Sequence, residues 1–538
     1  MLFLLPLITL ISSPQHISPS VDVLKVDPLL LVEAREVWDI IGRRDNPVWP
    51  GWDARKTPIL IYLPGKQDLL VNHPAPPTGF HRYSGALRSS IGGISVKDGP
   101  TIFDLDGQNT STSVNGVETL VVADTLSSRR QWIENAADSI VKNPSGAPQM
   151  IAKGLTPEPF DSMVMFAHEA FHVYQRQKAP DKSGVESSLV RYPSLSVENN
   201  LGYSLEADRL VEALHATSDR ELRESALRWI AVRNWRRSHL SQEAIDYENG
   251  TEFSEGLAKY VEYKTLECLQ KRKPSPEMWL VQNFRGYGDL SPERERLLRQ
   301  ARWFMNGESV VNNDLYGASS IRFRLYFSGM AIAALLDRLG ADWHDLIFQK
   351  GTTLTGLAEK AIHATPEELR SALATVTASS EYGAARAKKE KLASDGDVYV
   401  RDQIKEFNSA PGECVIDYSE LAEKDLSIVY TPFGILRIDD NRCFYRLIPI
   451  RGKVGGVSFE EELAKPILID RQLKQIRIPL TASLEPSDLS KQLNVSDVSS
   501  VAVNGQDLNL GGLKLKSIKG QLRLQGRELV IKLNRLTL

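Results

Sequence analysis

The spacing of hydrophobic residues changes twice along the chain, and these changes limit the folds that it can adopt. Residues 22–150 combine one helical stretch with short alternating segments that Gly, Pro and Asn separate. Residues 151–393 repeat apolar residues at helical spacing, and residues 398–538 return to short alternating segments. Alternation is typical of strands, and a period of 3.6 residues is typical of helices. We therefore expect an α+β multidomain protein, with a small mixed α/β N-terminal region that offers an edge strand, a mainly helical core, and a C-terminal β-sandwich-like domain.

Length and charge exclude several classes of protein. The 538 residues are enough for several domains. The 65 basic and 68 acidic residues give a net charge of −3, which provides no general attraction to polyanions, so we expect no nucleic acid as a partner. No apolar run reaches the roughly 18 residues that a transmembrane helix needs, so we expect no stable membrane insertion.

The first residues resemble a signal peptide. Met1 to Ser12 form an apolar run, and Ser18 and Ser20 fit a cleavage pattern of small residues. The usual basic start is missing, because the first Lys or Arg is Lys25. We predict a signal peptide over residues 1–20 and therefore a secreted or periplasmic protein. The alternatives are a buried N-terminal segment or a misplaced start codon.

Three local patterns predict further features. The segment Val114-Asn-Gly-Val117 lies between alternating residues and predicts a hairpin closed by an Asn-Gly turn. The charged stretch from Arg386 to Asp397 predicts a turn-rich boundary between the helical region and the β domain. We expect a set of basic residues beside Trp229 and Trp235 on a solvated helix face: Arg233, Arg236 and Arg237.

One short motif carries the chemistry. Residues 168–172 read His-Glu-Ala-Phe-His inside a helical segment for which Asp161 or Ser162 is a good N-cap. Two His residues four positions apart lie on one helix face, so both rings can reach a single metal ion. Glu169 lies about 100° round the helix and can act as a general base on a metal-bound water. We predict Zn²⁺ at His168 and His172, and we therefore expect the helical region to be a zincin-like catalytic core.

A catalytic zinc usually has a third protein ligand. The metzincin arrangement is excluded, because Gln175 and Lys178 replace its Gly and its third His. The best candidate is Glu255, since Gly256 and Ala258 beside it would let the two ligand-bearing helices approach closely. Two other acidic residues could serve instead: Glu206 and Glu252.

The segment Glu255-Gly-Leu-Ala-Lys-Tyr-Val-Glu262 resembles the second-helix motif of the gluzincin metallopeptidases, the thermolysin and aminopeptidase type. In that motif the Glu before Gly-x-Ala is a zinc ligand. The resemblance therefore implies that His168, His172 and Glu255 bind zinc and that Glu169 is the catalytic base. The distance in sequence between the two motifs is much longer here than in such aminopeptidases, which predicts an inserted helical pair. Their Gly-x-Met-Glu-Asn element is absent, so exopeptidase activity is not implied.

A carbonyl substrate also needs a group that stabilises the developing oxyanion. The candidates are Tyr316 and the run from Arg322 to Gly329, in which Tyr326 is the catalytic candidate. The alternative is an ordinary tyrosine with arginines at a helix start. The expected function is zinc-dependent hydrolysis of a peptide or protein substrate that pairs with the N-terminal edge strand. Two alternatives stay open: a catalytically inactive metallopeptidase-like binding protein, and a zinc hydrolase of a non-peptide amide or ester.

Overall fold

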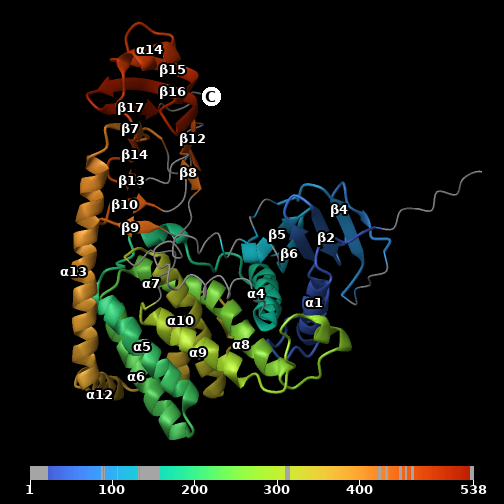
Figure 1. Ribbon diagram of the computed structural model, residues 1–538. Helices are drawn as coiled ribbons and strands as arrows, with labels where there is room; N and C mark the ends of the chain where they lie inside the picture. The colour runs from blue at the N-terminus through green and yellow to red at the C-terminus, as the bar shows by residue number, and fades with distance from the viewer. Residues whose placement is uncertain are drawn as a thin grey trace, which may run out of the picture.

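The computed structural model shows an α+β protein in which an N-terminal sheet, a helical region and a C-terminal sheet follow one another (Figure 1). The predicted signal peptide over residues 1–20 lies outside the described residues, within which no helix is long and apolar enough to cross a membrane. The structure describes residues 22–85, 89, 91–103, 105, 107–125, 127–130, 133, 158–308, 316–421, 426–429, 434–446, 451–454, 457–461 and 466–533.

The N-terminal region contains a six-stranded sheet with the strand order β3-β4-β2-β1-β6-β5. Asn115 and Gly116 both have positive φ angles, of 46° and 78°, as the predicted Asn-Gly hairpin turn requires. β5 pairs only with β6, so it forms one edge of the sheet. The elements are α1 (Leu29–Ile41), η1 (Ala54–Lys56), β1 (Ile59–Leu63), β2 (Gln67–Val71), β3 (His81–Arg82), β4 (Ile94–Asp98), β5 (Thr110–Val114) and β6 (Val117–Ala123).

The helical region begins with α4, which packs against α1, α8 and strands β5 and β6. α4 begins at Pro159, two residues before the predicted Asp161 cap, because proline suits the first turn of a helix. The helices are α4 (Pro159–Lys178), η3 (Glu186–Val190), α5 (Val197–His215), α6 (Asp219–Arg237), α7 (Gln242–Thr251), η4 (Glu252–Gly256), α8 (Leu257–Leu269), η5 (Pro276–Leu280), α9 (Ser291–Met305), α10 (Ser319–Arg338), η7 (Leu346–Phe348), α11 (Leu354–Ile362) and α12 (Pro366–Thr377).

Helices α7, η4 and α8 follow one another without a break, and η4 is a π-helical turn. Such turns are rare and are frequent at functional sites. At η4 the chain lies directly against α10, because a Cβ on Gly256 would be 2.6 Å from the Cα atom of Gly329. We expected Gly256 to bring together the two helices that share the metal. That expectation was wrong, since Gly256 faces α10 and not α4.

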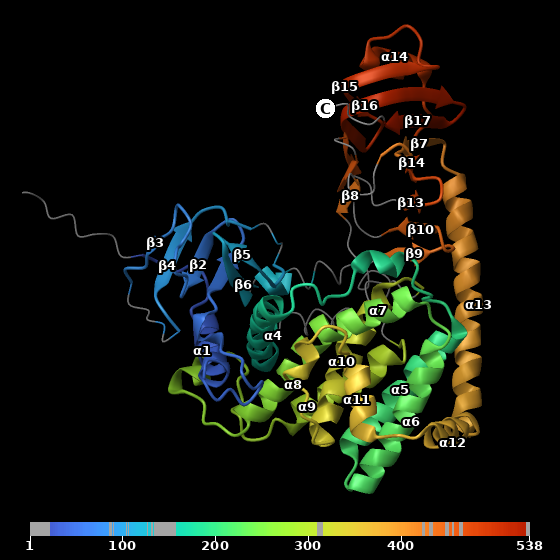
Figure 2. The same ribbon diagram turned by 180° about the vertical axis from the view of Figure 1, so that it is seen from behind.

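A single long helix, α13 (Ser380–Asn408), connects the helical region to the C-terminal sheet (Figures 1 and 2). Its 29 residues correspond to a length of about 43 Å. The prediction of a turn-rich stretch from Arg386 to Asp397 was wrong, because these residues lie inside this helix. Its charges form ion pairs at i,i+4 spacing, Arg386 with Glu390 and Lys391 with Asp395, and such pairs support a helix.

The C-terminal strands form one eleven-stranded sheet and not the two packed sheets of a sandwich, within the described residues. The reason is the parallel pairing of β17 with β7, which joins the last strand of the region to the first. The elements are β7 (Gly412–Asp417), β8 (Leu426–Val429), β9 (Ile435–Arg437), β10 (Arg442–Tyr445), β11 (Arg451–Val454), β12 (Val457–Glu461), β13 (Ile467–Asp470), β14 (Gln475–Leu480), α14 (Pro486–Leu493), β15 (Val501–Asn509), β16 (Leu513–Gln525) and β17 (Glu528–Leu533).

Candidate metal centre

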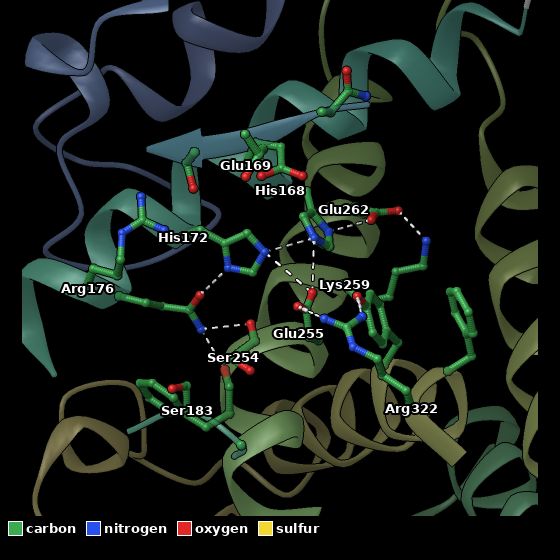
Figure 3. A pocket seen from close by; sticks show the side chains of 18 of the residues that line it. His168, Glu169, His172, Arg176, Ser183, Ser254, Glu255, Lys259, Glu262 and Arg322 are labelled. Atoms are coloured by element: carbon green, nitrogen blue, oxygen red, sulfur yellow. Dashed lines mark hydrogen bonds and ion pairs between the residues drawn. The ribbon is translucent and has the colours of Figure 1, made fainter. Parts of the chain in front are cut away.

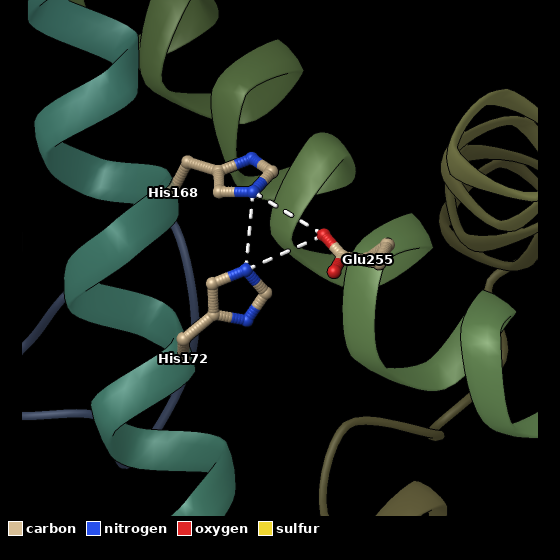
Figure 4. A group of neighbouring side chains, drawn as sticks. All are labelled: His168, His172 and Glu255. Carbon is tan, nitrogen blue, oxygen red and sulfur yellow. Dashed lines mark hydrogen bonds and ion pairs between the residues drawn. The ribbon is translucent and has the colours of Figure 1, made fainter. Parts of the chain in front are cut away.

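Three side chains from two helices meet as the sequence predicts (Figure 4). His168 and His172 come from α4, and Glu255 comes from the π-helical turn η4. The two imidazole Nε2 atoms are 3.1 Å apart, and Glu255 Oε2 lies 3.7 Å from His168 Nε2 and 3.5 Å from His172 Nε2. A tetrahedral zinc with ligand distances of about 2.0–2.1 Å separates its donor atoms by about 3.3 Å. The triangle of donor atoms therefore has the right size for one zinc ion.

The other ring nitrogen of each histidine is held by an acceptor (Figure 3). His168 Nδ1 donates to Glu262 Oε1 over 2.7 Å, and both side chains are buried. His172 Nδ1 is 2.9 Å from Gln175 Oε1. Gln175 Nε2 donates to the backbone carbonyls of Phe253 and Ser254, which fixes the amide so that its oxygen faces His172.

These partners determine which nitrogen of each ring is free. A neutral imidazole that donates from Nδ1 presents a lone pair at Nε2. His168 and His172 thus point two lone pairs at each other and at the carboxylate of Glu255. These electron pairs repel one another, and a cation between the three donor atoms would remove the repulsion. Nitrogen and carboxylate ligands suit zinc, and a partner on the second ring nitrogen is the usual support of a metal-bound histidine.

The pKa values reflect the same arrangement in the metal-free protein. Burial lowers the pKa of His168, but its contacts with Glu255 and Glu262 outweigh burial and raise the pKa to about 10. Burial raises the pKa of Glu255, whereas its contacts with His168 and His172 bring it well below its usual range. The carboxylates of Glu255 and Glu262 therefore stabilise a positive charge at His168. When no metal is bound, a proton on His168 supplies this charge.

Arg322 of α10 holds the carboxylate of Glu255 from the other side. Its Nη2 donates to Glu255 Oε1 over 2.9 Å, and its Nε donates to Glu186 Oε1 over 2.9 Å. This contact leaves Glu255 Oε2 as the oxygen that faces the histidines. Arg322 also donates to the hydroxyl of Tyr326, one turn further along α10. The structure thus brings Tyr326 to the site, where its ring stacks against that of His168.

Glu169 lines the same cavity, which has a volume of about 1000 Å³. Its side chain is only 8% exposed, and in Figure 3 it lies on the side of the His168 ring away from Glu255. It is thus beside the ligand cluster without belonging to it. A general base for a metal-bound water has to lie near the metal without being one of its ligands.

The edge strand β5 lines the same cavity as Glu169, through Thr110 and Ser111. Val114 and Val117 flank a two-residue turn and so form a hydrogen-bonded pair of the β5–β6 ladder. Hydrogen-bonded and non-hydrogen-bonded pairs alternate in an antiparallel ladder. Ser111 therefore presents its backbone N–H and C=O at the free edge, where an extended chain can pair with them.

The two rival ligands, Glu206 and Glu252, lie in a different place. Neither is among the described residues that line the cavity. Both belong to a cluster of paired side chains, the Arg–Glu network, whose members are Glu206, Glu248, Glu252, Arg233, Arg236 and Arg237. Arg233 Nη1 and Arg236 Nε lie 2.8 Å and 2.5 Å from the two oxygens of Glu206. Because the arginines form ion pairs with these carboxylates, Glu206 and Glu252 are not available to a metal in the cavity.

The position of these arginines corrects the prediction of a solvated helix face. Arg233 and Arg236 are fully buried. The reason is that α5, α11 and α12 all pack against α6 and cover the face that carries them. Each buried guanidinium then needs a carboxylate partner, and the acidic residues of α5, α7 and η4 provide one.

Sequence reasoning missed the role of Glu262, which supports His168. Glu262 lies seven residues after Glu255, about two helical turns further along nearly the same face. That spacing is the signal that could have identified it. Gln175 follows His172 by three residues and is likewise in reach of its ring.

Comparisons with known proteins give no further information about this site. No family model matches the chain, and neither the curated proteins nor the solved structures give a match.

Proposed function

We propose that this chain is a zinc-dependent peptidase of the gluzincin type. The observation that carries the proposal is the donor triangle of His168, His172 and Glu255, with the Nδ1 atom of each histidine held by an acceptor and with Glu169 beside it in the same cavity. Bound zinc would lower the pKa of a coordinated water and polarise the carbonyl of the substrate.

The side chains of the protein supply the remaining steps. Glu169 accepts a proton from the attacking water and delivers it to the amine that leaves, which regenerates the carboxylate. The pKa of Tyr326 lies well above its usual value, because burial and the neighbouring Glu255 disfavour the phenolate. Its hydroxyl therefore stays protonated and is a candidate donor to the oxyanion of the substrate.

The free edge of β5 favours a peptide over another amide or an ester. An extended peptide can add to a sheet edge through its own backbone hydrogen bonds, which a small ester lacks. Ser111 offers such an N–H and C=O at the cavity that Glu169 also lines. Glu169 in turn favours an enzyme over an inactive binding protein, since zinc binding alone does not require this carboxylate.

The decisive experiment replaces Glu169 by Gln in the full chain. We expect wild-type protein to bind one zinc and to cleave peptides of a mixed library, with products identified by mass spectrometry. Glu169→Gln should keep its zinc and lose about 10²–10⁴-fold in cleavage rate, because the base is gone. Asp161→Asn is a matched control, since Asp161 lies on the same helix with its side chain 53% exposed.

The alternatives give different outcomes. A Glu169→Gln protein that cleaves peptides at the wild-type rate would refute Glu169 as base. A wild-type protein that holds zinc and cleaves esters but not peptides would favour the non-peptide hydrolase. Zinc and peptide binding without any cleavage would favour the binding protein.

A further inference from the structure

One lysine lines the cavity at the end where His172 lies. The amide of Gln175 connects the His172 ring to the backbone carbonyl of Phe253. The ring of Phe253 also lines the cavity, and Lys182 Nζ lies 4.9 Å from the centroid of that ring. In Figure 3 the next residue, Ser183, is likewise on the His172 side of the cavity. The ammonium group of Lys182 therefore belongs to the His172 end.

Neutral groups hold this ammonium group in place. Lys182 Nζ donates to the backbone carbonyl oxygens of Ile347 and Gln349, the second over 3.2 Å. Together with the Phe253 ring, these carbonyls attract a cation but carry no net charge, so they fix its position without neutralising it. An ammonium group has three N–H donors, so the two carbonyl contacts leave one donor for a further acceptor.

The other Lys and Arg side chains that line the cavity have carboxylate partners. These ion pairs are Arg176 with Glu118, Lys259 with Glu262, and Arg322 with both Glu255 and Glu186. Lys182 differs, because no carboxylate among the described residues forms an ion pair with it. Burial lowers the pKa of Lys182 to about 8, so the charged form still predominates at pH 7. A half-buried charge without a counter-ion is unfavourable, and an anion in the cavity would relieve this cost.

We infer that Lys182 binds a carboxylate of the substrate, so that the preferred peptides carry this group on the His172 side of the bond that is cleaved. The inference rests on the proposed function and deepens it, because it names the class of peptide. The carboxylate is either an acidic side chain or the C-terminus of the peptide, since both offer the same two oxygen atoms to the ammonium group.

The first test measures binding without cleavage. Zinc-loaded full-length Glu169→Gln is titrated by calorimetry with pairs of peptides, in which one Asp is exchanged for Asn or the free C-terminus for an amide. A hydrogen bond to a charged group changes affinity by about tenfold to a hundredfold. We expect one of these exchanges to weaken binding by this factor, and the pair that shows it identifies the source of the carboxylate. Equal binding within every pair would overturn the inference.

The second test changes the lysine. Lys182→Met keeps the length of the side chain but removes its charge, so the acid and neutral peptides of the responding pair should become equal within about twofold in kcat/KM. Lys178→Met is the matched control, because Lys178 is an exposed cation at the end of α4 that does not line the cavity. It should keep the full preference. A preference that persists in Lys182→Met with normal zinc content and melting temperature would overturn the inference.

The two tests also separate this inference from the proposed function. The binding test needs no change at Lys182, so it decides even if Lys182→Met does not fold. A carboxylate preference in binding, but no cleavage by the wild type, would support the role of Lys182 and refute the peptidase. Cleavage at equal kcat/KM for acid and neutral peptides would refute the role of Lys182 and leave the peptidase.

Discussion

Glu252 and Glu255 lie three residues apart on one helix, yet they serve two different regions. Glu252 joins the Arg–Glu network, where Arg233 Nη2 lies 2.6 Å from its Oε2 atom. Glu255 faces the histidines of the cavity. In an α-helix, residues three apart are neighbours on one face. The π-helical turn η4 widens this spacing, so that the two carboxylates can point to different partners.

The two regions balance negative charge in different ways. In the Arg–Glu network the positive charges are guanidinium groups, which never lose their protons and belong to the fold. In the cavity the positive charge is exchangeable: it is a proton or, in our proposal, a metal ion between two histidines. The comparison suggests that the network serves stability and that the cavity serves function. Four predictions test this division.

The largest effect is expected in the network. Arg236→Met removes a partner of both Glu206 and Glu248 and leaves buried carboxylates undercompensated. Breaking a buried pair in this way costs about 3–5 kcal/mol. Urea unfolding of the metal-free protein measures the loss, and zinc content should stay at one. Arg220→Met, on the exposed side of the same helix α6, should change stability little. If Arg236→Met lost zinc but not stability, the assignment of stability to the network and of function to the cavity would be wrong.

The next effect concerns Glu255, the proposed third zinc ligand. Zinc at 100 times its dissociation constant should stabilise the wild-type protein by about 2.7 kcal/mol. Glu255→Ala removes a ligand and should abolish this stabilisation, which thermal unfolding with and without zinc can measure. The Arg236→Met variant should keep the stabilisation by zinc, although its metal-free form should be less stable than that of the wild type. Equal zinc stabilisation of Glu255→Ala and wild type would rule out Glu255 as a ligand.

A smaller effect is expected from the residue behind His168. Glu262→Gln keeps an acceptor for Nδ1 but removes its charge, which should weaken zinc binding by about 10-fold to 100-fold. Competition with a chromophoric chelator measures this affinity. Glu267→Gln is a matched control, because Glu267 is on the same helix and pairs with Lys264 and Lys271 instead. The prediction fails if both variants bind zinc equally well.

The smallest effect, taken per pH unit, is a pH dependence that only the cavity should show. The pKa of His168 is raised to about 10 in the metal-free protein, so zinc must displace a proton below that pH. Zinc affinity should therefore rise about tenfold per pH unit from pH 7 to pH 9. Because the pKa is raised, the stabilisation from protonated His168 is complete below the unfolded-state pKa of about 6.5 and is lost as the pH rises through about 10.

The Arg–Glu network should not respond over the same range. Burial raises the pKa of Glu248, but Arg236 and Arg237 outweigh burial and bring the pKa well below its usual value. Glu248 thus stays ionised from pH 7 to pH 9. Chelator competition at three pH values, and urea unfolding of the metal-free protein at the same values, test both statements. A zinc affinity that stays constant from pH 7 to pH 9 would contradict the assignment of the proton to the cavity.

The sequence was sufficient to predict the parts of the fold and the site that depend on local spacing. The His168–His172 pair, Glu255 after it and the Asn115-Gly116 hairpin all follow from short patterns, because helix and turn geometry fixes their neighbours. The helical pair between the two motifs was also predicted, and it is α5 and α6.

The features that were missed depend on contacts between distant segments. Arg233 and Arg236 have the sequence pattern of a solvated helix face, and only the packing of other helices over α6 buries them. The single C-terminal sheet results from a pairing between β7 and β17, the two ends of that region. The stretch from Arg386 to Asp397 has the composition of a loop, and its i,i+4 ion pairs favour a helix instead.

The close approach of Gly256 and Gly329 has a consequence for genetics. A Cβ on Gly329 would be 2.7 Å from the backbone of Glu252 and Gly256, so any larger residue would push α10 away from η4. Because α10 carries Arg322 and Tyr326, the displacement would reach the carboxylate of Glu255. In a random-mutagenesis screen for loss of zinc, position 329 would therefore be recovered together with the ligands, although this residue has no side chain to offer the metal.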